Sequence, residues 1–346
     1  MVFHFIKRLP IALLVIALNG CASFHPTQDA KDALVQVGTQ ERETVPVAQY
    51  AAGLAPYAIM AAKAYEHVDG HGNVDVSPTL FGEKTFGEKT KAAQTMLDAR
   101  WSYVTGHYGQ LCLNDAPSCG IVTGLEYQIW KTKPQAGVCR EFAIAFRGTD
   151  ANSIGDWLSN LHWVVRLLPL NDQYEQIQKN IQRVINQKIK TDDCYRASTQ
   201  IVSVGHSLGG GLAQQAAYMT RDIRRVYVFD PSFVTGSSDI HSDYENTRKG
   251  LRIERAYEHG EILAYPRFVF RQIVPFTNCD PQIRTIRFNL EKGDFISQHR
   301  INDLAANLVR ATPAKYRAAG YAPLPEPPAS IAAECRAQED QQLVRR

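Results

Sequence analysis

The sequence is short of several features that would decide its class at once. The chain has 346 residues, and none of its apolar stretches approaches the length of ~20 residues that a helix needs to cross a bilayer core. An excess of one charge is also missing, because 38 Lys and Arg residues against 35 Asp and Glu residues give a net charge of +3. A chain this close to neutral lacks the basic footprint of a nucleic-acid-binding protein. The hydrophobic fraction of 45% and the charged fraction of 21% exclude a disordered chain and are ordinary for a globular one.

Cysteine is present, but not at the spacing that zinc or a redox pair requires. None of the seven cysteines stands in a CxxC pair, so we expect no metal site. The six that follow Cys21 are an even number, and in an exported chain that indicates disulfides with 15 pairings open. These are Cys112, Cys119, Cys139, Cys194, Cys279 and Cys335. Cys112 and Cys119 flank a turn-like insert and are favoured as a local pair.

The N-terminus has the features of an export signal. Lys7 and Arg8 precede an apolar run of eight residues, 11–18, which is typical of a secretory signal peptide. The sequence LNGCAS around Cys21 resembles the lipobox of bacterial lipoproteins. The resemblance implies removal of residues 1–20, a diacylglycerol on Cys21, and, because Ala22 follows, the outer membrane of a Gram-negative cell envelope. The alternative is an ordinary signal peptide with a chance cysteine. We interpret residues 21–45 as a tether.

Alternating strands and helices predict an α/β fold with a mainly parallel sheet. We expect one domain over residues 46–320 and an extended Pro-rich tail over 321–346, with the duplicated FGEKT of 81–90 as a surface loop. Helices are predicted from residue 47 and over 172–189, 208–220 and 301–311, and strands over 125–131, 141–147, 201–204, 225–229, 251–257 and 283–289.

The residues that carry chemistry begin with a serine between glycines. Residues 201–204 are an apolar strand, and Gly205-His206-Ser207-Leu208-Gly209 follows directly before a helix. This is the G-x-S-x-G nucleophile elbow in its strand–turn–helix context, which raises the serine hydroxyl above the sheet. We predict Ser207 as the nucleophile. His206 we interpret as a packing or site-wall residue.

An oxyanion-binding loop is predicted upstream of the elbow. The strand ending at Phe146 leads into Arg147-Gly148-Thr149, where this fold places its second donor. The N–H of Leu208 supplies the first donor and Thr149 the second, and each stabilises the tetrahedral intermediate by about 3 kcal/mol.

Together these motifs resemble those of the class 3 (fungal-type) lipase family over residues 50–310. The matching residues are FRGT at 146–149, then Asp156, Trp157 and Asn160, then GHSLGG at 205–210. The resemblance implies an α/β-hydrolase fold and a serine esterase of acylglycerols and phospholipids that needs no metal or cofactor. It also implies the nucleophilic role of Ser207 and the oxyanion role of Thr149. Residues 157–170 are either a lid over the site or a buried core segment.

The acid and then the base must follow the serine along the chain. His299 is the one histidine beyond the last predicted strand, so we predict it as the base. Two carboxylates remain open for the acid. Glu261 follows the strand 251–257 and is favoured, although the family has aspartate there, while Asp230 ends the preceding strand.

The leading hypothesis is therefore a lipid-anchored serine hydrolase of lipid esters, of lipase or phospholipase type, that works through an acyl-enzyme. An acyltransferase or thioesterase with the same triad is the second hypothesis. A non-enzymatic envelope lipoprotein with a hydrolase-like fold is the third.

Overall fold

The computed structural model describes ten ranges of the chain, which together hold the sheet and its covering helices. The described residues are 29–65, 67–68, 74–75, 86–107, 125–148, 171–232, 247–261, 263, 277–295 and 297–344. The export signal with Cys21, the Cys112 and Cys119 pair, Thr149, and the segment 157–170 lie outside them.

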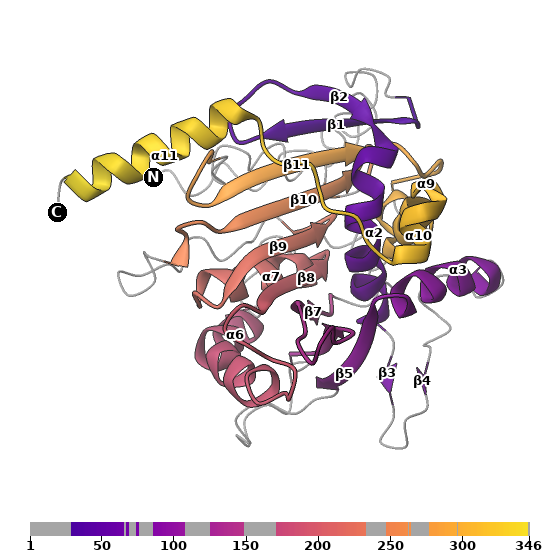
Figure 1. Ribbon diagram of the computed structural model, residues 1–346. Helices are drawn as coiled ribbons and strands as arrows, with labels where there is room; N and C mark the ends of the chain where they lie inside the picture. Colours follow the sequence, from indigo (N-terminus) through magenta and orange to yellow (C-terminus); the bar gives the residue numbers. More distant parts are fainter. Residues whose placement is uncertain are drawn as a thin grey trace, which may run out of the picture.

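A nine-stranded sheet runs through the centre of the molecule (Figure 1). Its order is β2-β1-β11-β10-β9-β8-β7-β6-β5. The strands are β1 (Asp32–Val37), β2 (Glu43–Pro46), β5 (Trp101–His107), β6 (Tyr127–Thr132), β7 (Glu141–Phe146), β8 (Gln200–His206), β9 (Ile223–Phe229), β10 (Arg252–Glu258) and β11 (Gln282–Phe288). A separate two-stranded sheet pairs β3 (His67–Val68) with β4 (Val74–Asp75).

The five strands from β7 to β11 are parallel, and an antiparallel pair extends the sheet at each edge. Parallel strands are covered on both faces and are therefore rich in apolar residues. β7, with the sequence EFAIAF, is buried at every position. The predicted α/β class with a mainly parallel sheet is confirmed.

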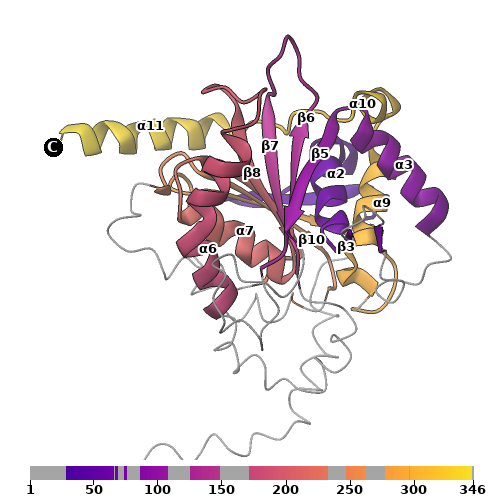
Figure 2. The same ribbon diagram turned by 90° about the horizontal axis from the view of Figure 1, so that it is seen from below.

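Helices cover the two faces of the sheet in separate layers (Figure 2). One face carries α6 (Asn171–Val184), which continues as a π-helical turn over Ile185–Ile189, and α7 (Leu208–Tyr218). The other face carries α2 (Val47–Lys63), α3 (Phe86–Asp98) and α9 (Ile301–Ala311). A short helix, α10 (Ala314–Ala319), follows α9. The bounds of α9 are those of the helix predicted over 301–311.

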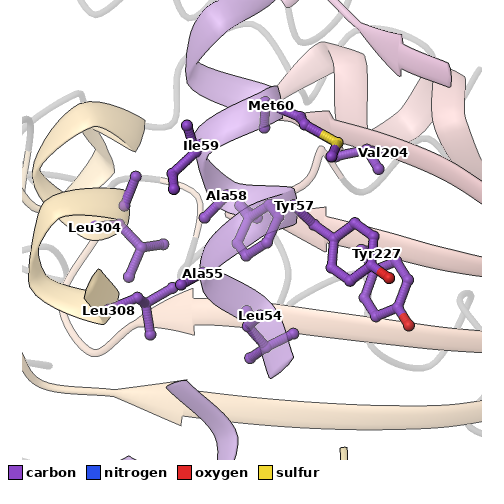
Figure 3. Packing of buried hydrophobic residues seen from close by; sticks show 14 of the residues in the cluster. Leu54, Ala55, Tyr57, Ala58, Ile59, Met60, Val204, Tyr227, Leu304 and Leu308 are labelled. Atoms are coloured by element: carbon purple, nitrogen blue, oxygen red, sulfur yellow. The ribbon is translucent and has the colours of Figure 1, made fainter. Parts of the chain in front are cut away.

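The core between α2, α9 and the sheet combines small and large apolar residues (Figure 3). Alanines on α2 let Leu304 and Leu308 of α9 approach closely. On the side of α2 that faces the sheet, Tyr57 stacks on Tyr227 with ring centroids 3.7 Å apart. These contacts fix α2 against β8 and β9, next to the strand end that carries the elbow.

The sheet includes residues that we assigned to a tether. β1 and β2 lie within 21–45 and its border, and β1 pairs with β11. In β1, Ala33, Val35 and Val37 are buried while their neighbours are partly exposed. This alternation is that of a half-buried strand, so the tether ends before Asp32. The short length of both strands hid the pattern.

The C-terminal segment 321–346, which we predicted to be extended, is helical in its second part. Residues 321–328 have no regular structure, but α11 (Ala329–Val344) follows and extends away from the sheet (Figure 1). After the last proline the sequence is rich in Ala, Glu, Gln and Arg, which favour helix. The second half of the 81–90 duplication is helical as well, since α3 begins at Phe86.

Two disulfides connect described parts of the chain. Cys139, just before β7, is bonded to Cys194, and Cys279, just before β11, is bonded to Cys335 of α11. Their Cα–Cα distances are 5.1 and 5.3 Å. The second disulfide, with hydrogen bonds from Asn278 to Glu334, ties α11 to the body. Among the described residues, no helix combines the length and the apolar content needed to span a bilayer.

We expect the double change Cys139→Ala and Cys194→Ala to lower the free energy of unfolding by about 2–4 kcal/mol, because the disulfide closes a long loop in the unfolded chain. The pair lies at the start of β7, whereas the elbow lies at the other end of the sheet, so kcat/KM for an ester stays within about threefold. Denaturant unfolding and ester turnover measure the two effects. The disulfide is contradicted if non-reducing peptide maps of the wild type show either thiol free.

Candidate active site

Ser207 sits in a strained turn between β8 and α7. Its backbone angles are φ 55° and ψ −123°, a conformation that L-residues rarely adopt. Strain of this kind costs about 1–3 kcal/mol and persists only where the surroundings impose it. Here the N–H of Ser207 donates to the carbonyl of Phe229, and its own carbonyl accepts from Gly210 and Ser232. The turn is thus held from β9 and from α7.

Glycines make the turn sterically feasible. A Cβ on Gly205 would overlap the carbonyl oxygen of Gly209, and a Cβ on Gly209 would overlap that of Phe146. A Cβ on Gly210 would lie 2.8 Å from Cβ of Pro231. The glycine spacing of the motif therefore follows from the close approach of helix, elbow and strand ends.

The structure brings together Ser207, His299 and Glu261. His299 Nε2 lies 3.1 Å from Ser207 Oγ, and His299 Nδ1 lies 2.8 Å from Glu261 Oε2. Because the carboxylate accepts from Nδ1–H, Nε2 is left to accept the serine proton. All three residues are buried, with the His299 and Glu261 residues 2% and 0% exposed. The arrangement is that of a nucleophile, a base and an orienting acid.

The loop that carries Glu261 is fixed by two further contacts. Glu261 Oε2 also accepts from the N–H of Leu263 at 2.8 Å, which orients the carboxylate from its own loop. One residue earlier, the N–H of Gly260 donates to the side-chain oxygen of Gln298 at 2.6 Å. Gln298 precedes His299 in a 3₁₀ turn, Ser297–His299. The loop that carries Glu261 and the turn that carries His299 are therefore hydrogen-bonded to each other one residue before each of these side chains.

Asp230, the alternative acid, lies next to the triad but serves a different set of backbone groups. It is fully buried, has φ 39°, and its Oδ1 accepts from the N–H of Glu258 at 3.0 Å. Burial, with the charge of Asp230, raises the pKa of Glu258 to about 8. Glu258 therefore gives up its proton less readily than an exposed carboxyl group.

The oxyanion side of the site is only partly described. Leu208 opens α7, and the first N–H groups of a helix have no acceptor within it, so this N–H is free to bind an oxyanion. The strand end before Thr149 is anchored by Arg147, whose guanidinium pairs with Glu126 and whose N–H donates to the carbonyl of Glu126 at 3.0 Å. Thr149 itself lies outside the described residues.

His206 does more than pack. Its Nδ1 lies 2.9 Å from the hydroxyl of Tyr65, and its Nε2 lies 2.9 Å from the backbone oxygen of His299. The two imidazole rings are 4.8 Å apart. The interpretation of His206 as a site-wall residue was therefore incomplete, and its sequence position beside Ser207 gave no sign of the contact with His299.

One cluster near the serine contains side chains of the type that bind metals. His206, Asp230 and His299 each place one potential ligand atom within 4.8 Å of the others. Both ring nitrogens of each histidine are engaged in the hydrogen bonds given above. A metal would have to break the contact of His299 with Ser207 or with Glu261, so the cluster fits a hydrogen-bonded network better than a metal site. A second group, Cys139, Asp192 and Cys194, has its sulfurs in a disulfide.

Three contributors were not found from the sequence. Tyr65 lies two residues after the end of α2, more than a hundred residues before the elbow, and Gln298 and Glu258 have no distinctive local pattern. Only the position of Gln298 next to the predicted base was a usable signal. The remaining contacts depend on the tertiary fold.

Comparison with known families agrees with this geometry. Residues 110–231 match the model of a family described as "Phospholipase-like: Tle-like phospholipase domain". The matched range covers about a third of the chain, includes Ser207, and ends before Glu261 and His299. Over this range the match agrees with the resemblance to lipase-type α/β hydrolases. A search among curated proteins gives no match.

Three solved structures are similar over part of the chain. Lipase II from Rhizopus niveus has 16% identity over 62% of this chain and 74% of its own, with a TM-score of 0.37. Acetyl xylan esterase from Paenibacillus sp. R4 has 13% identity over 51% of this chain and 79% of its own, with a TM-score of 0.24. Acetyl xylan esterase 1 from Thermoanaerobacterium sp. JW/SL YS485 has 10% identity over 65% of this chain and 94% of its own, with a TM-score of 0.28.

The contacts of the two carboxylates predict different outcomes for their amides. Glu261→Gln removes the charge that stabilises the His299 imidazolium, so we expect kcat/KM to fall by at least about 10²-fold. Asp230→Asn, the matched control, changes a carboxylate bonded to the N–H of Glu258 and acts mainly on the thermal midpoint. If instead Asp230→Asn abolishes turnover at an unchanged thermal midpoint, the acid is Asp230.

Proposed function

We propose that this chain, a carboxylic-ester hydrolase with the α/β-hydrolase fold, hydrolyses lipid esters through Ser207, His299 and Glu261. The observation that carries the proposal is the continuous hydrogen-bonded line from Ser207 Oγ through His299 to Glu261, with distances of 3.1 and 2.8 Å. The phospholipase description of the family matched over residues 110–231 supports a phospholipid as the ester.

The first half of the reaction forms an acyl-enzyme. Ser207 Oγ attacks the ester carbonyl carbon while His299 Nε2 takes the hydroxyl proton, and Glu261 stabilises the resulting imidazolium through Nδ1–H. The carbonyl oxygen becomes an oxyanion, which accepts from the N–H of Leu208 and from Thr149 as the second donor. The carbon–oxygen bond to the alcohol then breaks, and His299 returns the proton to that alcohol.

The second half releases the acid. Water replaces the alcohol, His299 Nε2 takes one of its protons, and the hydroxide oxygen attacks the acyl carbon. The bond to Ser207 Oγ breaks, and the proton on His299 goes back to the serine. Every proton that moves in the cycle is held by His299, which explains why the imidazole is fixed from both ring nitrogens.

The site is tested by removing the nucleophile. Ser207→Ala should lower kcat by about 10⁴–10⁶-fold on a panel of phospholipids, triacylglycerols and nitrophenyl esters, since the triad acts as a unit. Ser203→Ala is the matched control. Ser203 is buried in the same strand, and its hydroxyl donates to the carbonyl of Ala213 at 2.8 Å, so its loss lowers stability and leaves turnover intact.

The outcome that contradicts the assignment is ester turnover by Ser207→Ala at more than about a tenth of the wild-type rate, with the folded state verified by circular dichroism. Equal loss of activity in both serine variants would assign the effect to the strand rather than to the nucleophile. The substrate that the wild type turns over with the highest kcat/KM defines the ester class.

The same proposal includes a place in the cell envelope. Cleavage before Cys21 and attachment of diacylglycerol to its sulfur would hold the domain at the outer membrane, next to phospholipid. A single lipid chain gives only marginal membrane binding, whereas two or more acyl chains anchor stably, so a diacylated cysteine is sufficient.

We expect Cys21→Ser to yield a chain without acyl groups that no longer sediments with outer membranes. Mass spectrometry of the N-terminal peptide measures the modification directly. Ala22→Asp is the control, since it keeps the lipid and changes the sorting signal. An unmodified wild-type N-terminus after residue 21 would show an ordinary secreted protein.

A further inference from the structure

His206 forms a hydrogen bond that the reaction above does not use. Its Nε2 lies 2.9 Å from the backbone oxygen of His299, the residue that moves every proton. We infer that His206 is a positioning residue that holds the backbone of His299, and that Tyr65 holds the His206 ring in the form that can do so. The inference rests on the proposed function, because it assigns His206 a part in aiming that base.

Donor and acceptor rules determine the first half of the inference. A carbonyl oxygen only accepts, so His206 Nε2 must carry a hydrogen. In the neutral ring Nδ1 is then an acceptor, and the Tyr65 hydroxyl, 2.9 Å away, donates to it. Tyr65 therefore favours the Nε2–H tautomer, the one that can donate to His299. The ring is 3% exposed, which disfavours its charged form.

Charged groups of both signs lie near the two rings. Asp230 places a carboxylate oxygen within 4.8 Å of a ring nitrogen of each histidine, while the Arg147 guanidinium, which is paired with Glu126, lies 6.0 Å from the Tyr65 ring. When His299 takes the serine proton, a second positive charge on a ring 4.8 Å away would oppose it. A neutral His206 fixes the base without that repulsion.

The Tyr65 hydroxyl also touches the loop that leads to the predicted oxyanion donor. A Cβ on Gly148 would overlap this hydroxyl and would lie 2.7 Å from the backbone oxygen of His206. The Tyr65 phenol, just after α2, thus lies against Gly148 and His206 and, through His206, is connected to His299.

The first experiment reads the tautomer and needs no substrate. In ¹⁵N-histidine-labelled wild type at pH 7, long-range ¹H–¹⁵N correlation should show His206 as the neutral Nε2–H form, assigned by the signals lost in His206→Gln. Tyr65→Phe removes the donor to Nδ1 and should shift the Nδ1 resonance. An Nδ1–H tautomer or an imidazolium in the wild type would overturn the inference, whatever the activity.

The second experiment separates positioning from packing. His206→Leu should lower kcat by roughly 10- to 10²-fold with KM nearly unchanged, because a misplaced base slows chemistry and not binding. His206→Gln, whose amide offers both a donor and an acceptor, should recover most of that loss. Tyr65→Phe should lower kcat by roughly three- to tenfold, as a milder displacement of the same ring.

Tyr57→Phe is the matched control for Tyr65→Phe. Tyr57 lies on α2, eight residues before Tyr65, and donates its buried hydroxyl to Glu141 at 2.7 Å, away from the elbow. Its loss should lower the thermal midpoint and leave kcat and the His206 resonances unchanged. Equal kcat losses in Tyr57→Phe and Tyr65→Phe, or in the Leu and Gln variants of His206, would overturn the positioning role. Failure of the esterase assignment itself would instead appear as a wild type without turnover.

Discussion

The strained backbone at Ser207 is the constraint on which the rest of the site depends. A serine with φ 55° is held only because β9 accepts its N–H, α7 donates to its carbonyl, and glycines let the helix pass the strand end. The strain of about 1–3 kcal/mol is offset by the packing of the whole sheet around it. This conformation places the Ser207 hydroxyl at the start of α7, where the first N–H groups of a helix have no acceptor within the helix.

The other functional residues are placed by the parallel strands. β7 leads to Arg147 and Gly148, β8 to Ser207, β9 to Asp230, and β10 to the Glu261 loop, so all four strand ends meet at one edge of the sheet. His299 follows β11 and reaches the same edge from a 3₁₀ turn before α9. Contacts of Gln298, and of His206 at the end of β8, connect these strand ends and loops to one another.

The sequence was most informative where the signal is local. The elbow is one short motif, and α9 has the bounds that its apolar periodicity predicts, since Ile301, Leu304 and Leu308 form one buried stripe. The choice between Glu261 and Asp230 could not be made this way, because each follows the end of a parallel strand. The two carboxylates differ in their hydrogen bonds, since Glu261 bonds to His299 and Asp230 to the N–H of Glu258.

Other features were hidden for identifiable physical reasons. β1 and β2 are too short for their alternation to stand out from a polar segment, and the prolines before α11 obscured the helix formers behind them. The contact of Tyr65 with His206 joins residues 141 positions apart, and no local pattern encodes such a pair. The sequence therefore pointed to Ser207, His299 and Glu261, which the structure brings into contact, but not to the residues around them.

The central claim is that Ser207 forms the acyl-enzyme. The most direct measurement is peptide mapping by mass spectrometry after the native protein reacts with a fluorophosphonate or is quenched during turnover of an ester. The account predicts one adduct per chain, on the peptide and the residue that contain Ser207. An adduct on any other residue, or an unmodified chain that still turns over the ester, would contradict it.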